Sequence, residues 1–536
     1  MRSRLNFLIL LWLLPIWGFA QKESPKPNWQ NLDLTRDGVF GMSTEKAYSE
    51  LLIDKIGKPI IVAVVDGGVD IQHEELKDHI WRNEREVAND SIDDDKNGYI
   101  DDLYGWNFIG NANGQNVQYD NLEVVRLVRE LQPTYVSVLP TTPLAEAERR
   151  KFLRYQKMNT DYMQKLQIAQ LTERAIKEFK QEVDSIYNRM NKENPTDFDF
   201  KHYKPRNKAE RKTVSMIRDG MDEEGNYSAF YEELIEGVKH YEAQVNYHLN
   251  MAYDSRPTVG DHYEDSKERD YGNADVTGPD ALHGTHVAGI IAANRSDSNT
   301  VKGVADLAQI MVLRVVPDGD ERDKDVANAL FYAVDNGAKV INMSFGKAYV
   351  KDKAIVDSAV RYAMSKDVLL IHAAGNDGQD NDTNPNFPNR NYVDSLGLNM
   401  GVADNWIEVG ASNWKNDESL VADFSNYGKR TVDVFAPGVA ITSTIPQSKY
   451  KKEDGTSMAA PAVSGVAALI RSYYPQFNAS EVKRIILESV VKPTQKVKIK
   501  QQGSKKKVLL SDICITGGIV NAYNALKLAS ERATSK

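Results

Sequence analysis

Three short segments of the chain contain the residue types that nucleophilic catalysis requires. Asp66 ends an apolar run, His283 begins the segment HGTHVAG, and Ser457 lies in the segment GTSMAAP. A serine hydroxyl is a weak nucleophile until a base removes its proton. A histidine can be that base, and an aspartate beside it orients the ring and stabilises the imidazolium. The segments therefore predict acyl transfer, with Ser457 as nucleophile, His283 as general base and Asp66 as its orienting residue.

The order of these segments resembles that of subtilisin-like serine proteases, the subtilase family, and differs from the order in chymotrypsin-like enzymes and α/β-hydrolases. The resemblance covers about residues 40–115 and 270–530, and it indicates an exported bacterial type with a large insertion between the Asp and His motifs. An enzyme of this kind also needs donors for the oxyanion. The resemblance implies that the Asn376 side-chain amide is one donor and the Ser457 backbone N–H is the other.

Two further stretches resemble the walls of the substrate cleft in this family. The first wall consists of Ser344, Phe345 and Gly346, and the second of Ala373, Ala374 and Gly375. Small residues there would let a peptide lie along the backbone as an added strand. The primary specificity is not readable from these residues, although Asp377, beside Asn376, would favour a basic substrate side chain.

His283 and His286 have an alternative interpretation as a metal-binding pair, since residues at i and i+3 share one face of a helix. The glutamate of an HExxH motif is absent, however, and no third ligand is evident. In the subtilase family the second histidine is structural, so the resemblance implies a structural role for His286.

A second chemical signal lies in the segment DDDKNGYIDD, residues 93–102. Its opening matches a calcium loop of the form D-x-D-x-N-G, in which oxygen ligands at alternate positions converge on the ion. The sequence therefore predicts a structural Ca²⁺ site that consists of Asp93, Asp95, Asn97 and Asp101. An ordinary EF-hand has a glutamate at the twelfth position, where this chain has Tyr104, and an acidic turn without metal is the alternative.

Apolar, β-branched runs predict the elements that would position these residues. Strands are expected at 60–65, 310–316, 339–344, 368–374, 402–410 and 432–435, and helices at 325–336 and 357–365. Runs of this kind are typical of strands that are buried on both faces. Their alternation with helices predicts an α/β fold with a mostly parallel central sheet. The family resemblance implies the three-layer subtilisin-like form of this fold.

Residues 120–270 interrupt the alternation and predict an inserted helical subdomain. Apolar residues recur there at helical spacing over 144–190 and 227–253, while 191–207 contains prolines and charges and is expected to be a loop. The expected organisation is a signal peptide at 1–20, the catalytic domain at 21–119 and 271–530, and the helical insertion at 120–270. Residues 21–59 are too few for the folding propeptide that many secreted subtilases carry.

Near the end of the chain, Lys496, Lys498 and Lys500 alternate with apolar residues, and Lys505 begins a run of three lysines. Two such segments separated by a glycine predict an exposed hairpin. Lysines commonly protect the edge of a sheet against further pairing, and a surface that binds anions is the alternative.

The first 20 residues are typical of an export signal. Arg2 and Arg4 precede an apolar run over 7–17, and Ala20 is a small residue at the expected cleavage site. The run is shorter than the about 20 residues that a membrane-spanning helix needs. We expect a mature protein that is secreted or periplasmic and has no stable membrane insertion, with an uncleaved anchor as the alternative.

The composition narrows the possible functions. The formal net charge is 67 − 76 = −9, which argues against nucleic acid as the main partner, and the single Cys514 excludes an intrachain disulfide. Together these observations predict a serine endopeptidase that acts on peptide or protein substrates. A protease-like binding module that presents the helical insertion to a partner is the alternative, and the residues alone do not distinguish a peptidase from an esterase.

Overall fold

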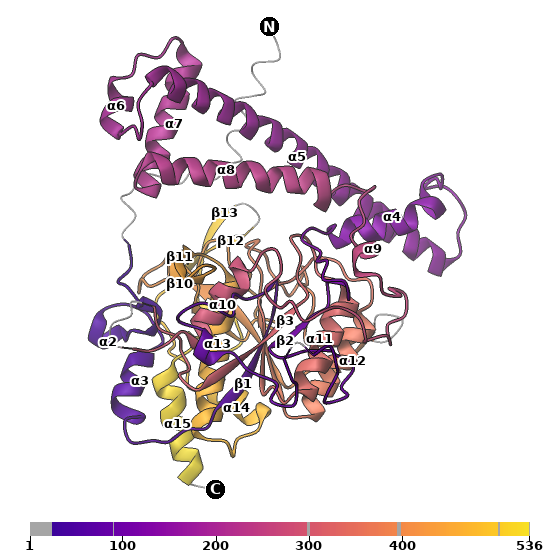
Figure 1. The fold of residues 1–536 in the computed structure, drawn as a ribbon, viewed down its shortest axis with the longest axis vertical. Coiled ribbons are helices and arrows are strands. Elements are labelled where there is room, and N and C mark those ends of the chain that lie inside the picture. The colour runs from indigo at the N-terminus through magenta and orange to yellow at the C-terminus, as the bar shows by residue number, and fades with distance from the viewer. Residues whose placement is uncertain (1–23, 89, 297–300, 394–397, 502–503, 535–536) are drawn as a thin grey trace. The chain divides into compact units, whose positions relative to one another are not determined.

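The computed structural model describes residues 24–88, 90–296, 301–393, 398–501 and 504–534 (Figure 1). The predicted signal peptide, residues 1–20, lies outside these ranges. The described chain forms two compact units. The sheet unit contains Glu23–Glu123 and Ser255–Lys536, and the helical unit contains Val124–Asp254.

A seven-stranded sheet runs through the sheet unit in the order β2-β3-β1-β4-β5-β8-β9. Its strands are β1 (Ile60–Asp66), β2 (Gly105–Asn107), β3 (Ala308–Arg314), β4 (Val340–Met343), β5 (Leu369–Ala373), β8 (Trp406–Ser412) and β9 (Val434–Pro437). Every neighbouring pair in this sheet is parallel. The predicted α/β fold with a mostly parallel sheet is confirmed.

Helices cover both faces of the sheet. Alternate residues of each strand point to opposite sides, and both sets are apolar, so each face packs against helices. Val62 and Val64 of β1 belong to one core, and Ala63 and Val65 belong to the other. The first core also contains α10 (Leu282–Ala292), α13 (Thr456–Tyr473), α14 (Ala479–Glu488), α15 (Ala522–Thr534) and α3 (Thr44–Leu51). The second contains α11 (Asp323–Asp335) and α12 (Lys353–Ser365). The three-layer fold is therefore as expected.

Smaller elements complete this unit. Three two-stranded sheets are formed by β6 (Asn391–Val393) with β7 (Asn399–Val402), β10 (Ile441–Ile445) with β11 (Lys449–Glu453), and β12 (Val497–Gln501) with β13 (Ser504–Val508). The short helices are η1 (Trp29–Asn31), α2 (Leu34–Asp37), η2 (Lys77–His79), α9 (Arg256–Val259) and η4 (Leu510–Asp512). The predicted lysine-rich hairpin is thus present as β12–β13, with Val497 and Ile499 buried.

The helical unit is built from long amphipathic helices. They are α5 (Glu146–Met190), α6 (Asp197–His202), α7 (Lys208–Glu224), α8 (Tyr227–Ala243) and η3 (Gln244–His248), and α4 (Glu123–Tyr135) leads into the unit. Apolar residues such as Ile186 of α5, Ile217 of α7 and Leu234 of α8 form a common core. The expectation of a loop at 191–207 is wrong over α6, where a Thr196–Asp199 capping box begins a short helix.

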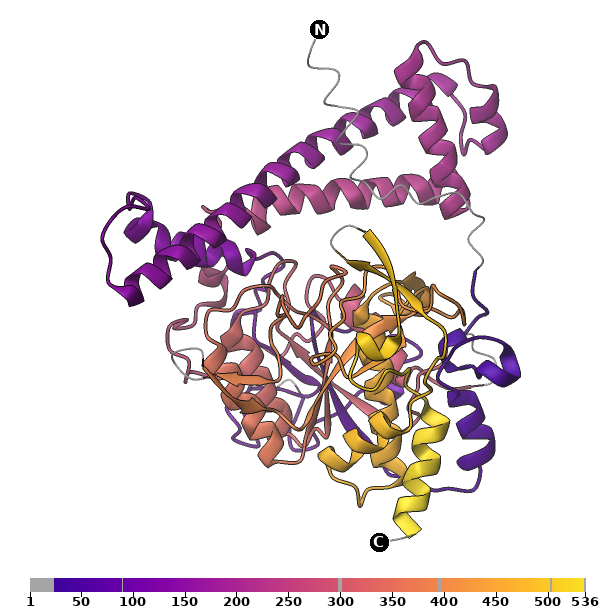
Figure 2. The same ribbon diagram turned by 180° about the vertical axis from the view of Figure 1, so that it is seen from behind.

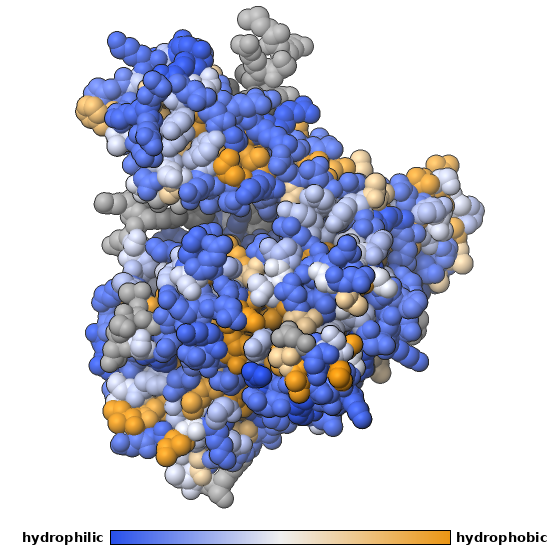
Figure 3. Space-filling model, viewed as in Figure 1, coloured by the Kyte–Doolittle hydropathy of each residue, from blue (hydrophilic) through white to orange (hydrophobic). Residues whose placement is uncertain are grey.

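Hydrophilic residues cover most of the face that Figure 3 shows. Within the described ranges, no helix combines the length and the apolar character that crossing a membrane requires.

Candidate active site

Three neighbouring strands, β1, β4 and β5, bring most of the predicted site residues to one edge of the sheet. Asp66 is the last residue of β1, Ser344 directly follows β4, and Ala373 ends β5 three residues before Asn376. In open α/β sheets, ligands bind outside the carboxyl ends of the strands. The topology therefore gathers Asp66, both predicted cleft walls and the predicted oxyanion donor at the edge where a ligand is expected.

Asp66 and His283 are joined by a hydrogen bond. The His283 Nδ1 lies 2.8 Å from Asp66 Oδ1 and 3.0 Å from Oδ2, and the Gly67 N–H donates to the same Oδ1 at 2.8 Å. Gly284 permits this approach, because a Cβ at that position would lie only 2.2 Å from the Gly68 carbonyl oxygen. The start of α10 can therefore pack directly against the end of β1.

The environment of His283 suits a general base. Partial burial of the ring disfavours its charged form, but the charge and the hydrogen bond of Asp66 outweigh this effect and raise the pKa of His283. The Asp66 side chain is 2% exposed and that of His283 is 44% exposed. Since Nδ1 faces Asp66, Nε2 on the other side of the ring is the nitrogen that can exchange a proton with a substrate or nucleophile.

Ser457 lies in the first turn of α13, where the positive end of the helix dipole favours a developing anion. Its hydroxyl donates to the Ser344 carbonyl oxygen at 3.1 Å, and the Ser344 hydroxyl donates to the Ser457 carbonyl oxygen at 2.9 Å. The nucleophile predicted from the sequence is thus held against the first cleft wall. The described residues include no Ser457–His283 hydrogen bond, and such bonds are often long in free enzymes.

The two predicted oxyanion donors converge beside Gly455. A Cβ at Gly455 would lie 3.5 Å from the Ser457 backbone nitrogen and 3.7 Å from the Asn376 Nδ2. The Asn376 Oδ1 accepts from the backbone N–H and the hydroxyl of Thr456. These bonds orient the amide, so that its Nδ2 is free to donate. Because Gly455 has no side chain, space stays open beside the Asn376 Nδ2 and the Ser457 backbone nitrogen.

Asn386 is a site residue that the sequence reasoning missed. Its Nδ2 donates to the Ala373 and Ala374 carbonyl oxygens, at 3.3 Å each. A Cβ at Gly346 would lie 2.5 Å from this Nδ2, and one at Gly375 would lie 3.4 Å from it. The Asn386 side chain therefore lies between the two cleft walls. No motif marks it in the sequence, since it is ten residues beyond Asn376 in an irregular loop.

His286 is bound by the backbone of the β10–β11 hairpin. Its Nε2 lies 3.0 Å from the Ile441 carbonyl oxygen and 3.1 Å from that of Lys451, so this nitrogen carries the proton and donates. Burial lowers the pKa of His286 to about 4, which keeps the ring neutral. These contacts favour the structural role over the metal-binding alternative.

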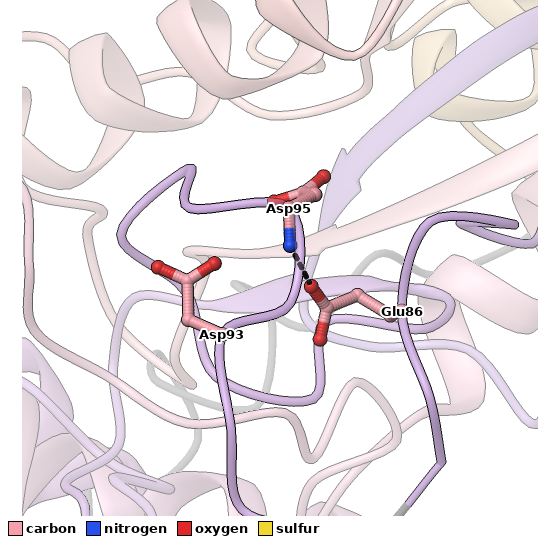
Figure 4. Close-up of side chains that lie close together, drawn as sticks. All are labelled: Glu86, Asp93 and Asp95. Atoms are coloured by element: carbon pink, nitrogen blue, oxygen red, sulfur yellow. Dashed lines mark hydrogen bonds between the residues drawn. The ribbon is translucent and has the colours of Figure 1, made fainter.

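Two residues of the predicted calcium loop, Asp93 and Asp95, form an acidic cluster with Glu86, which precedes the loop (Figure 4). One carboxylate oxygen from each residue lies within 4.8 Å of the others, and the Asp95 N–H donates to Glu86 Oε1 at 3.1 Å. The Glu86 Oε2 is buried and has no hydrogen-bond partner among the described residues. Burial, together with the neighbouring carboxylates, raises the pKa of Glu86.

The other predicted ligands make different contacts. The Asn97 Oδ1 accepts from the Tyr99 N–H, and its Nδ2 donates to Asp102, at 2.8 Å each. Asp101 accepts from the Ser91 N–H through Oδ2. Sequence reasoning missed Glu86, because it precedes the loop motif by seven residues and has no spacing signal of its own.

Comparison with known proteins is consistent with this site. A family model described as "Subtilase family" matches residues 57–508. The chain is 38% identical over 209 residues to a thermophilic serine proteinase of Bacillus sp. (strain AK1), over 39% of this chain and 46% of that protein. It is 40% identical over 191 residues to thermitase of Thermoactinomyces vulgaris (35% and 61%) and 36% identical over 202 residues to subtilisin BL of Lederbergia lenta (38% and 67%).

The matched part of the chain thus spans about half to two thirds of the length of these relatives. The family match extends over most of the 536 residues and includes all three predicted catalytic positions. The chain belongs to the subtilase family.

Proposed function

We propose that the protein is a serine endopeptidase that hydrolyses peptide bonds through an acyl-enzyme. The observation that carries this proposal is the Asp66–His283 hydrogen bond at the same sheet edge as Ser457 and the Asn376 amide. An oriented histidine, a serine at a helix N-terminus and two convergent N–H donors are the parts that acyl transfer needs.

The proposed reaction begins when the Ser457 Oγ attacks the substrate carbonyl carbon and the His283 Nε2 accepts the hydroxyl proton. The carbonyl oxygen becomes an anion, which the Asn376 Nδ2 and the Ser457 N–H stabilise. His283 then gives the proton to the leaving amine, and Asp66 stabilises the imidazolium between the two transfers. A water molecule hydrolyses the ester on Ser457 by the same steps in reverse order.

Active-site labelling tests this proposal. A fluorophosphonate probe should modify Ser457, and mass spectrometry of the labelled peptide should locate the modification. The Ser457→Ala variant is the control and should not be labelled. A peptide library should be cleaved at amide bonds by the unmodified protein, whereas labelling without cleavage, or cleavage of esters only, would contradict the proposed endopeptidase activity.

A structural calcium ion on the acidic cluster is part of the same proposal. Three carboxylates close together repel one another, and the buried Glu86 Oε2 offers a ligand atom that no N–H or hydroxyl of the described residues occupies. Ca²⁺ accepts irregular sets of oxygen ligands. Such an ion would be bound by Glu86, Asp93 and Asp95, and it would stabilise the loop without a part in catalysis.

Export is likewise proposed from residues 1–20, whose charged start, apolar run and small residue at 20 suit a signal peptide. The test is N-terminal sequencing of the protein recovered from the periplasm and from the culture medium. A mature N-terminus at or near residue 21 is the expected result, whereas an intact Met1 in the membrane fraction would indicate an uncleaved anchor.

A further inference from the structure

The β12–β13 hairpin presents four lysines on one of its faces. In the antiparallel register, Lys498 lies opposite Lys507, and Lys500 lies opposite Lys505. Directly opposed residues of an antiparallel pair point to the same side. We call Lys498, Lys500, Lys505 and Lys507 the lysine face. The hairpin is visible in yellow in Figure 2.

The lysine face carries more positive charge than its neighbours neutralise. Both oxygens of Glu418 are used, one by Lys498 and one by Lys507. Asp423 pairs with Lys505 at 2.7 Å. Lys500 has no carboxylate partner among the described residues, although like charges directly opposite one another destabilise a sheet. The face is therefore suited to accept one further carboxylate.

The lysine face also adjoins the loop that carries the oxyanion donor. A Cβ at Gly378, two residues after Asn376, would lie 3.8 Å from both Cβ and Cδ of Lys500. The Gly378 N–H donates to the Phe424 carbonyl oxygen at 2.7 Å, and Phe424 directly follows Asp423. The unpaired ammonium is thus carried by a residue that packs on the active-site loop.

Edge protection does not explain this arrangement. Lysines that guard a strand edge are effective wherever an edge is exposed. They need no contact with an active-site loop, and they need not be placed opposite one another. A surface that selects substrates by charge, in contrast, needs both the opposed lysines and the contact with the active-site loop. Positive charge without a partner, close to the scissile bond, attracts an acidic group of the substrate.

We propose that the lysine face binds an acidic side chain of the substrate on the leaving-group side of the scissile bond. The backbone passes from the second cleft wall at 373–375 through Asn376 to Gly378, so the lysine face adjoins the part of the loop beyond the oxyanion donor. This inference rests on the proposed peptidase function. It predicts a preference opposite to the basic one that Asp377 alone would favour.

Paired peptides test the proposal. Each pair carries Glu or Gln at one of the three positions after the scissile bond, in an otherwise constant and cleavable sequence, and kcat/KM is measured for each peptide. Exposed ion pairs contribute about 0.2–1 kcal/mol, so we expect the Glu peptide to be preferred by about 1.4- to fivefold at one or more positions. The preference should disappear in 1 M salt, because salt screens exposed charges.

Two variants locate the effect. Lys500→Gln should reduce the Glu/Gln ratio to near one. Lys506→Gln removes the same charge from the same hairpin, but Lys506 lies opposite Ile499 on the other face, so this variant should keep the ratio. The Glu/Gln ratio is unaffected by a uniform loss of active protein. Circular dichroism checks that both variants are folded.

The outcomes separate this inference from the proposed function. If no peptide is cleaved and Ser457 is not labelled, the proposed function fails. If peptides are cleaved with a Glu/Gln ratio near one, with a preference for Lys or Arg, or with equal effects of Lys500→Gln and Lys506→Gln, the inference fails while the peptidase assignment stands. A Glu preference confined to positions before the scissile bond would also overturn it.

Discussion

The Asn376 Oδ1 accepts two hydrogen bonds from Thr456, one from its backbone N–H and one from its hydroxyl, each at 2.9 Å. Thr456 is adjacent to Ser457 and begins α13. The Thr456 hydroxyl also accepts from the Gly375 N–H at 3.1 Å. One threonine therefore orients the predicted oxyanion donor, contacts the second cleft wall and leads directly into the predicted nucleophile.

Removal of the oxyanion donor should lower kcat. We expect Asn376→Ala to reduce kcat by a factor of about 10²–10³, the usual effect of losing one such donor. Thr456→Val keeps the shape of the side chain but removes the hydroxyl, so the Asn376 Oδ1 retains only one of its two hydrogen bonds, and we expect a smaller loss of kcat. Thr456→Ser keeps a hydroxyl and should have a kcat close to that of the unmodified protein. Steady-state kinetics on one peptide substrate measures all three, and a Thr456→Val loss equal to that of Asn376→Ala would contradict a purely orienting role.

Loss of a triad member should nearly abolish turnover. Ser457→Ala and His283→Ala should each lower kcat by a factor on the order of 10⁶, and the double variant should lose no more than either single variant, since the residues act as a unit. Single-turnover assays with a fluorogenic peptide would measure these rates. Residual activity of Ser457→Ala within tenfold of the unmodified enzyme would show that another residue is the nucleophile.

The raised pKa of His283 predicts the pH dependence of activity. His283 must be neutral to accept the Ser457 proton, and Asp66 stabilises the charged form. The kcat/KM value should therefore rise with pH through a midpoint above the ordinary histidine value of 6.5 and then level off. Asp66→Asn removes the carboxylate charge, so the midpoint should move to lower pH while kcat falls by about 10⁴. An unchanged midpoint in this variant would contradict the proposed cause.

The same pKa shift affects stability. Because the folded-state pKa is raised, the contribution of His283 to the free energy of unfolding is fully present below the unfolded pKa near 6.5 and is lost as pH rises through the folded value. A comparison of the Tm of Ser457→Ala with that of Ser457→Ala/Asp66→Asn would measure this contribution to stability, and neither protein should undergo autolysis. The Tm difference between them should be larger at pH 5.5 than at pH 9.

The position of Asn386 predicts a narrow pocket for the substrate side chain between the walls. Asn386→Gly should enlarge this pocket and increase kcat/KM for peptides with Phe before the scissile bond relative to Ala, by about tenfold. Asn384→Gly is the matched control, because Asn384 lies in the same loop and its side-chain amide donates to the Asp380 carbonyl oxygen and the Thr383 hydroxyl. An equal Phe/Ala ratio in all three proteins would show that Asn386 does not limit the pocket.

Calcium should affect stability rather than the chemical step. An ion that binds only the folded state contributes roughly 2.7 kcal/mol at a hundredfold excess over its Kd, so a chelator should lower the Tm of a unit of this size by roughly 2–4 °C. Initial rates at low temperature should barely change. Differential scanning fluorimetry on Ser457→Ala protein, with and without calcium, measures the shift, and elemental analysis gives the ion content.

Variants of the acidic cluster provide the control for this measurement. Glu86→Gln with Asp93→Asn should remove the difference between calcium and chelator. Asp94→Asn should keep it, because Asp94 lies outside the cluster and accepts from the Val87 N–H. If the unmodified protein melts at one temperature in both solutions and contains no calcium, the loop is only an acidic turn.

The sheet was predictable because its strands are continuous apolar runs. Val62–Val65 and Leu369–Ile371 are fully buried, so every position selects for an apolar residue and the pattern is visible without alternation. The edge strand β2 was not predicted, since its three residues are too few to give a recognisable hydrophobic pattern. The helix α6 escaped because its capping box lies within a charged, proline-containing stretch.

The predicted site differs from the observed arrangement where a contributing residue has no motif in the sequence. Asp66, His283 and Ser457 lie in segments with a recognisable pattern, and the Asp66–His283 contact follows from it. Glu86 and Asn386 have no local sequence signal. The fold brings the Glu86 loop to the acidic cluster and the Asn386 loop to the predicted cleft walls. Only the three-dimensional path of the chain shows this.

The insertion also imposes an order of events on the newly made chain. The two strands that pair with β1 are synthesised long after it, since β3 begins at Ala308 and β4 begins at Val340. His283, which binds Asp66, follows it in the sequence by 217 residues. Such non-local pairings form slowly, whereas the contacts of adjacent helices such as α7 and α8 are local. During synthesis the helical segment can fold while β1 is still unpaired, and the oxyanion pocket cannot close before Ser457 has left the ribosome. The nascent chain thus cannot have the proposed peptidase activity before the segment that contains Ser457 has been made.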